Sequence, residues 1–208
     1  KEANFDKIKE YTSDEFINSI PEFVKDKYNS DVIFAFYYGS NDKPYPGLGN
    51  SEVIPNEERK EYEELSKIKG WRRMLSNFWI EPFEYDGLKW NTAEHYYQAS
   101  KFKKNNPDFY KMFSLDSESS FNQDPIRAKA AGDKTGKLKS EQIRPKNIKV
   151  DSDFFENKNS EKQMYLAQFY KFNNSNAKYL KDMLSKTKDA KLLHMMPRST
   201  EREFYENL

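Results

Sequence analysis

A polar row on one predicted helix carries the residue types best suited to chemistry. The segment NTAEHYYQASKFKK spans residues 91–104, and in a helix of about 3.6 residues per turn its positions i, i+4 and i+7 share one face. Those positions hold Glu94, Gln98 and Lys101. Tyr97 flanks the row on one edge, and Phe102 and His95 flank it on the other, which is unusual for a solvated face. An enclosed carboxylate two turns from an ammonium favours a small-molecule site.

Two plainer explanations of Glu94 remain open at this point. Asn91 and Thr92 can each serve as the helix N-cap. If Asn91 is the cap, Glu94 falls at the third helical position, where a capping-box glutamate binds the backbone of the cap residue. Alternatively, the helix is exposed to solvent, and Glu94 and Lys101 form only a weak charge pair.

Two other segments place polar groups next to aromatic runs. In FYYGS, Tyr37 and Ser40 lie at the end of a predicted strand, which is a common position for ligand-binding groups. In LSNFW, Asn77 lies beside Phe78 and Trp79. The Asn77 carboxamide either completes a turn or enters a pocket, and the sequence leaves both open.

Short apolar runs separated by turn residues predict the elements that position these groups. A β-branched and aromatic run predicts a strand over 32–38, and Asp86-Gly87 predicts a two-residue hairpin turn. The predicted helices run over 56–75 with a break near Gly70, from Asn91 to about Asn105, from Asp124 to Gly132, over 159–174 and over 176–187. The run 191–196 is a candidate strand. The fold class is therefore α+β, a mostly helical domain with a small sheet or hairpin.

The chain is predicted to hold one domain and an extension. Residues 1–30 form an N-terminal helical extension in which apolar residues recur at helical spacing, and residues 31–208 form the domain. Pro21 is expected to interrupt the extension. Gly132 is expected to cap the C-terminus of its helix, because AAGDKTGK lacks the spacing of a phosphate-binding loop.

Composition limits the classes of function. The net charge of +1 gives no overall polyelectrolyte character, so any nucleic-acid contact must be a local patch. The absence of cysteine excludes thiol catalysis, and with two histidines a metal site is not expected; no cofactor is expected either. No apolar run reaches the roughly 20 residues that span a bilayer, so no membrane partner is expected. A reducing, cytoplasmic compartment suits a chain without cysteine.

From Phe36 onward the chain resembles the NADAR family, also called YbiA-like. FYYGS resembles the family's opening strand motif, and LSNFWIEPFEYDGLKWNTAEHYYQASKF resembles its central block. AKAAGDKTGKLKSEQIRPKN is similar to its glycine-containing segment, which ends in an Arg-Pro pair at Arg144. MYLAQFYKF and KYLKDMLSKTKDAKLLHMM resemble its last helices and closing strand. The resemblance covers most of residues 34–197, and GLGNSEVIPNEE has the form seen in larger members.

This resemblance implies an N-glycosyl hydrolase that acts on ribose joined to a nitrogen base. The family's glutamate and lysine fall on Glu94 and Lys101, the ends of the polar row. The glutamate would stabilise positive charge at C1′ or activate a water. The lysine would either bind a pyrophosphate or form a Schiff base with an opened ribose. The expected substrate-binding residues are Tyr37, Ser40, Asn77, Phe78, Trp79, Trp90, Tyr97, Gln98 and Arg144, with Trp90 and Tyr97 as rings that stack on the base.

The expected partner is a substrate that contains ADP-ribose. The first hypothesis is removal of ADP-ribose from guanine in DNA or RNA. The alternatives are hydrolysis of riboflavin-pathway intermediates, a non-catalytic ADP-ribose reader, and a nucleic-acid-binding module, which the near-zero net charge disfavours. The tail HMMPRSTEREFYENL lacks the Trp-Gly ending common in bacterial members and resembles eukaryotic and viral members, so the base specificity stays open.

Overall fold

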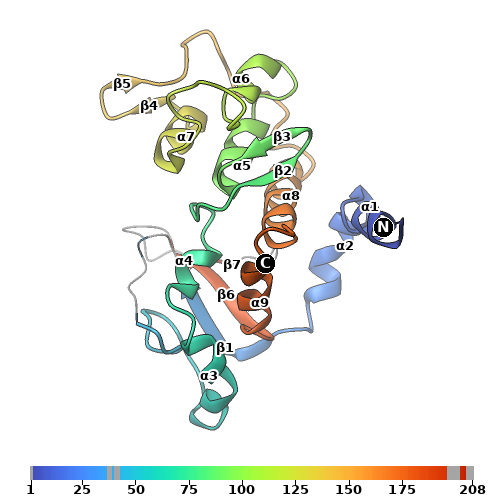
Figure 1. Cartoon of the computed structure of the whole chain (residues 1–208), viewed down its shortest axis with the longest axis vertical. Coiled ribbons are helices and arrows are strands. Elements are labelled where there is room, and N and C mark those ends of the chain that lie inside the picture. The colour runs from blue at the N-terminus through green and yellow to red at the C-terminus, as the bar shows by residue number, and fades with distance from the viewer. Residues whose placement is uncertain (1, 37–38, 40–42, 196–201, 205–208) are drawn as a thin grey trace. The chain divides into compact units, whose positions relative to one another are not determined.

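The computed structural model describes residues 2–36, 39, 43–195 and 202–204. The predicted fold class is confirmed, because the protein is α+β and mostly helical with small sheets. The chain forms two compact units, one made of residues 1–76 and 179–208 and the other of residues 77–178 (Figure 1). In the described part of the chain, no helix is both long enough and apolar enough to cross a membrane. The predicted domain boundary after residue 30 stays a prediction.

The first unit is built around a small sheet. Its elements are α1 (Glu2–Tyr11), α2 (Asp14–Val24), β1 (Asn29–Phe36), the 3-10 helix η1 (Asn56–Tyr62), α3 (Glu63–Ser66), α4 (Trp71–Leu75), almost all of α9 (Lys178–Ser185), β6 (Ala190–Met195) and β7 (Arg202–Phe204). The strand order is β1-β6-β7, with β1 parallel and β7 antiparallel to β6. Phe34 of β1 packs edge-on against Tyr62 and Trp71, with ring centroids 5.1 and 5.4 Å away. The predicted strands at 32–38 and 191–196 correspond to β1 and β6.

The N-terminal helices divide at a different residue from the predicted one. Pro21 lies inside α2 and does not interrupt it, so that expectation is wrong. The break falls at Ser13, whose side-chain oxygen accepts a hydrogen bond from the backbone N–H of Phe16 at 3.2 Å. An N-cap of this kind begins a new helix by satisfying one of its free N–H groups.

The predicted break near Gly70 is confirmed. The segment 56–75 forms η1, α3 and α4 in succession, and Gly70 precedes α4 with a φ of 74°. A residue with a side chain rarely adopts this left-handed conformation, whereas glycine adopts it without steric cost. The chain therefore turns at Gly70 and starts a separate short helix.

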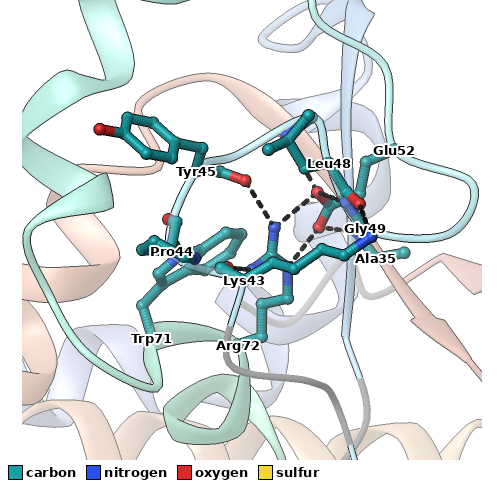
Figure 2. Close-up of polar contacts among 10 residues, drawn as sticks. Ala35, Lys43, Pro44, Tyr45, Leu48, Gly49, Glu52, Trp71 and Arg72 are labelled. Carbon is teal, nitrogen blue, oxygen red and sulfur yellow. Dashed lines mark hydrogen bonds and ion pairs between the residues drawn. The ribbon is translucent and has the colours of Figure 1, made fainter.

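A buried ion pair anchors the loop segment 43–52. Arg72 of α4 donates from Nε and Nη2 to the two carboxylate oxygens of Glu52, each at 2.7 Å, as Figure 2 shows. The same Nη2 donates to the carbonyl oxygen of Tyr45 at 3.0 Å. Glu52 also accepts from the backbone N–H groups of Gly47 and Gly49, both at 2.9 Å. Side-chain hydrogen bonds, and not a helix or strand, therefore fix the conformation of this segment.

The second unit contains the predicted hairpin and the polar row. Its elements are β2 (Phe83–Tyr85), β3 (Leu88–Trp90), α5 (Ala93–Ser100), α6 (Pro107–Lys111), α7 (Pro125–Gly132), β4 (Lys137–Leu138), β5 (Glu141–Gln142) and α8 (Asn159–Phe172) (Figure 1). Asp86 and Gly87 have φ angles of 56° and 72°, as a two-residue hairpin turn requires, so this prediction is confirmed. α5 ends before the predicted Asn105, since the carbonyl of Lys101 accepts instead from the N–H of Asp151 at 2.8 Å.

Candidate functional site

Thr92 caps α5, which fixes the position of Glu94 in the helix. Thr92 has the extended backbone typical of an N-cap, and its Oγ1 accepts from the backbone N–H of His95 at 3.2 Å. Glu94 is therefore the second helical residue and not the third. The capping-box explanation of Glu94 is wrong, because Asn91 is not the cap residue.

The Glu94 carboxyl group is buried, with the residue only 6% exposed. Nε2 of Gln98 donates to its Oε1 at 2.8 Å, and the backbone N–H of Glu94 donates to the carbonyl oxygen of Asn77 at 3.0 Å. Burial raises the pKa of Glu94, while the hydrogen bond from Gln98 and the charges of Lys129 and Lys101 act in the opposite direction. A carboxyl group with a raised pKa exchanges its proton closer to neutral pH than an exposed glutamate does.

Lys101 lies at the other end of the row and is also buried. Its Nζ donates to the carbonyl oxygen of Gly132 at 3.1 Å and lies 5.3 Å from the ring centroid of Tyr97. Burial lowers the pKa of Lys101, and the negative charges of Glu94 and Asp133 oppose that shift. The row is therefore enclosed, and its explanation as an exposed helix face is wrong.

Arg144 binds the C-terminal end of α7. Its Nη1 donates to the carbonyl oxygens of Ala131 and Asp133 at 2.8 and 2.7 Å, and its Nη2 donates to that of Lys134 at 3.1 Å. Cations near a helix C-terminus satisfy carbonyl groups that have no partner within the helix. Arg144 and Lys101 thus hold the same helix end. The buried guanidinium is engaged by the backbone, so this geometry does not support the expected contact of Arg144 with a substrate.

α8 adds side chains that sequence reasoning did not assign to the site. Met164, Gln168 and Lys171 recur at i, i+4 and i+7, the same spacing as the row on α5. Gln168 donates from Nε2 to Oδ1 of Asn77, and Nδ2 of Asn77 donates to Sδ of Met164 at 3.4 Å. Burial lowers the pKa of Lys171 to about 7. The signal that could have found them is this second polar row within the aromatic segment MYLAQFYKF.

Trp90 lies in the core of the second unit. Its residue exposure is 0%, and its ring packs against Tyr96 and Tyr110 with centroids 5.3 and 5.2 Å away. Its indole N–H donates to the carbonyl oxygen of Tyr85 at 2.9 Å. The expectation that Trp90 stacks on a base is not supported, because neither face of this ring reaches solvent.

The remaining predicted aromatic residues lie closer to the surface. Phe78, Trp79 and Tyr97 are half-buried, and Nζ of the exposed Lys129 lies 5.8 Å from the ring centroid of Phe78. The structure therefore brings Asn77, Glu94, Gln98 and Lys101 into one buried group, called here the polar cluster. These aromatic rings lie at its margin. Tyr37 and Ser40 lie outside the described residues, as does the tail segment 196–201, so their expected contributions stay predictions.

The His95 side chain is held by hydrogen bonds within the protein. Its Nδ1 lies 2.8 Å from Oγ1 of Thr92 and its Nε2 lies 3.0 Å from the carbonyl oxygen of Phe121, so both ring nitrogens have hydrogen-bond partners. Burial lowers the pKa of His95 to about 4. Within the described ranges, no group of three histidine, aspartate or glutamate side chains could hold a metal ion.

The fold and the polar row define an α+β protein with a buried carboxylate and lysine on one helix. The sequence profile of the NADAR domain matches residues 56–200, and the chain belongs to this family, as its motifs predict. Family membership suggests an N-glycosidase type of function. The NMR structure of the Escherichia coli protein YbiA is similar to this chain at 20% identity and a TM-score of 0.44, over 85% of this chain and 75% of that one. A search of curated proteins gives no match.

Proposed function

We propose that this protein is an N-glycosidase that removes ADP-ribose from guanine in a DNA or RNA strand, with Glu94 as the catalytic residue. The observation that carries the proposal is the buried Glu94 carboxyl group, which Gln98 holds within electrostatic range of two lysines. Helix capping does not account for this carboxyl group, since Thr92 is the cap. Membership in the NADAR family supports the type of bond that is broken.

The chemistry of the bond explains why a carboxylate is needed. As the bond between C1′ of ribose and the base nitrogen stretches, positive charge develops on the sugar. The Glu94 carboxylate stabilises this charge and takes a proton from the water that attacks C1′. The base leaves with the electron pair of the broken bond and takes up a proton. The raised pKa of Glu94 suits a group that gains and loses a proton in one cycle.

Lys101 contributes a cation to the same site. An ammonium has three N–H donors, and the carbonyl of Gly132 accepts one of them. The described residues offer no second acceptor to this ammonium, so two donors remain for a phosphate group of the substrate. A Schiff base at Lys101 would require the amine to leave that carbonyl and lose its proton, so the hydrogen bond favours the phosphate-binding role.

The contacts of the nucleic-acid strand would be local. Lys103 pairs with Asp86 at 2.7 Å and Lys104 pairs with Asp153, and all four side chains are partly exposed. Exposed ion pairs contribute little to stability, so backbone phosphates can replace these carboxylates. Binding should therefore weaken modestly with salt. A single-stranded or flipped guanine is the accessible form, since stacking hides the glycosidic bond in a duplex.

The experiment that tests the proposal is a turnover assay with an oligonucleotide that carries ADP-ribosyl-guanine, in the presence of EDTA. Mass spectrometry measures free ADP-ribose and intact guanine. The wild type should release ADP-ribose and leave unmodified guanine in the oligonucleotide, and Glu94→Gln should leave the ADP-ribosyl-guanine intact, because an amide carries no charge and accepts no proton. Glu94→Gln should remain folded, since its amide oxygen can still accept from Gln98. Glu118→Gln is the matched control, because that glutamate is exposed in the same unit.

Each other outcome of the assay would support a different conclusion about the function. Full turnover by Glu94→Gln would exclude Glu94 as the catalytic residue. Ribose phosphate from a riboflavin-pathway intermediate, without product from the oligonucleotide, would move the protein to a metabolic role. Binding of ADP-ribose without product from either substrate would identify a reader.

A further inference from the structure

The side chain of Gln98 connects Glu94 of the proposed function to a glycine on the neighbouring helix α7. The Gln98 amide nitrogen donates to Glu94 at 2.8 Å, and the side chain also packs against Gly132. A Cβ atom added at Gly132 would lie 2.0 Å from Oε1 of Gln98 and 2.8 Å from its Cβ and Cδ. Contacts this short do not occur, so any side chain at position 132 must displace the Gln98 side chain.

Gly132 is not required by its backbone conformation. It is the last residue of α7, and the C-cap is Asp133, whose backbone is extended at φ −75° and ψ 171°. The residues with left-handed φ in the described part of the chain do not include Gly132. The expectation that Gly132 is a C-cap glycine is therefore wrong. The absence of a side chain matters here because α5 approaches α7 closely at Gln98.

Among the described residues, Glu94 is the hydrogen-bond partner that orients the Gln98 amide. Its Oε1 is buried and finds no hydrogen-bond donor among the described residues. A buried acceptor without a donor costs free energy, which the hydrogen bond from Nε2 to the carboxylate offsets. Gln98 therefore directs its Nε2 donor toward Glu94, and its Oε1 acceptor is left without a donor among the described residues.

We propose that Gln98 and Gly132 are positioning residues for Glu94: Gly132 leaves the space that Gln98 occupies, and Gln98 holds the carboxylate in its working orientation. This inference rests on the proposed function for its kinetic consequence, but its structural part does not. The hydrogen bond from Gln98 also lowers the proton affinity of Glu94 against the effect of burial.

The test is a double-mutant cycle with Gln98→Ala, Gly132→Ala and the double variant. If Gly132→Ala acts only by displacing Gln98, each single variant loses about tenfold to a hundredfold in kcat/KM, and the double variant is no worse than Gln98→Ala alone. Losses that multiply in the double variant would overturn the proposal. Gln98→Met keeps the volume of the side chain and removes its donor, so it should match Gln98→Ala; wild-type activity in Gln98→Met would also overturn it.

A second measurement does not depend on turnover. The carboxyl carbon of Glu94 is assigned by NMR from the signal lost in Glu94→Gln and is then titrated with pH. Gln98→Met and Gly132→Ala should both raise the pKa of Glu94, because each removes the same hydrogen bond. An unchanged titration in both variants would refute the positioning role. If the two variants change the titration of Glu94 but the wild type shows no turnover, the proposed function is refuted and the positioning role of Gln98 and Gly132 is supported.

Discussion

The buried pair of Arg72 and Glu52 offers a direct test of how burial sets the strength of an ion pair. The Arg72 side chain is 4% exposed and that of Glu52 is 0% exposed. The carboxylate accepts two hydrogen bonds from the guanidinium, which Figure 2 shows. It accepts three more from the backbone N–H groups of Ala35, Gly47 and Gly49. We predict that Glu52→Gln strongly destabilises the first unit, because it leaves a buried guanidinium without its counter-charge.

The size of the effect follows from the environment of the pair. Removing one partner of a buried ion pair costs about 3–5 kcal/mol. For a protein of this size, each kcal/mol shifts the unfolding midpoint by about 2–4 °C, so the midpoint should fall by about 6–20 °C. Circular dichroism on heating measures this shift. Urea unfolding then gives the change in free energy at one temperature.

A more exposed ion pair, which also has two hydrogen bonds between guanidinium and carboxylate, supplies the control. Arg127 donates from Nη1 and Nη2 to the two carboxylate oxygens of Glu141 at 2.9 and 2.6 Å, and the Glu141 side chain is 57% exposed. Glu141→Gln should shift the midpoint far less than Glu52→Gln, because solvent already screens this pair. Equal shifts in the two variants would refute the reasoning that burial decides the cost.

Three further predictions address single residues. Thr92→Ala should lower the free energy of unfolding by about 1 kcal/mol in urea, because it removes the cap of α5; no change would exclude Thr92 as the cap. Gly87→Ala should lower it by about 1–2 kcal/mol, since the turn requires a left-handed φ there, and a neutral result would contradict the hairpin geometry. Lys171 has a pKa of about 7 when folded and 10.5 ordinarily, so the unfolded chain binds more protons between these values and stability should rise from pH 7 to 9. Lys171→Met should flatten that rise in urea unfolding at several pH values, and an unchanged slope would exclude Lys171 as its source.

Local signals allowed part of the fold to be predicted from the sequence. Asp86-Gly87 has few alternatives to a hairpin, because both positions need φ above zero. Asp124 and Pro125 start α7 as predicted, since the Asp124 side chain accepts from the backbone N–H of Ile126 and proline needs no donor at the first helical position. Such features depend on residues that are neighbours in the chain.

The features that the sequence left open or did not reveal have a different physical origin. Asn91 and Thr92 are both good caps, and only the path of the chain into α5 decides between them. The role of Gly132 depends on Gln98, which lies on another helix. Arg144 was expected to bind the substrate, but its guanidinium donates to carbonyl groups at the end of α7. Each of these outcomes depends on contacts between distant segments, which periodicity and propensity do not contain.

The buried polar groups of the second unit are better explained by function than by stability. Gln98 and Gln168 each hold a buried Oε1 that has no donor in the part of the chain described, and each lies beside a residue of the polar cluster, Glu94 or Asn77. An apolar side chain of similar volume at either position would avoid the cost of an unpaired acceptor. A site that must orient a carboxylate cannot use that solution, because only a donor fixes both the direction and the proton affinity of Glu94. The buried acceptors that lower the stability of the fold therefore lie next to the groups that the proposed chemistry uses.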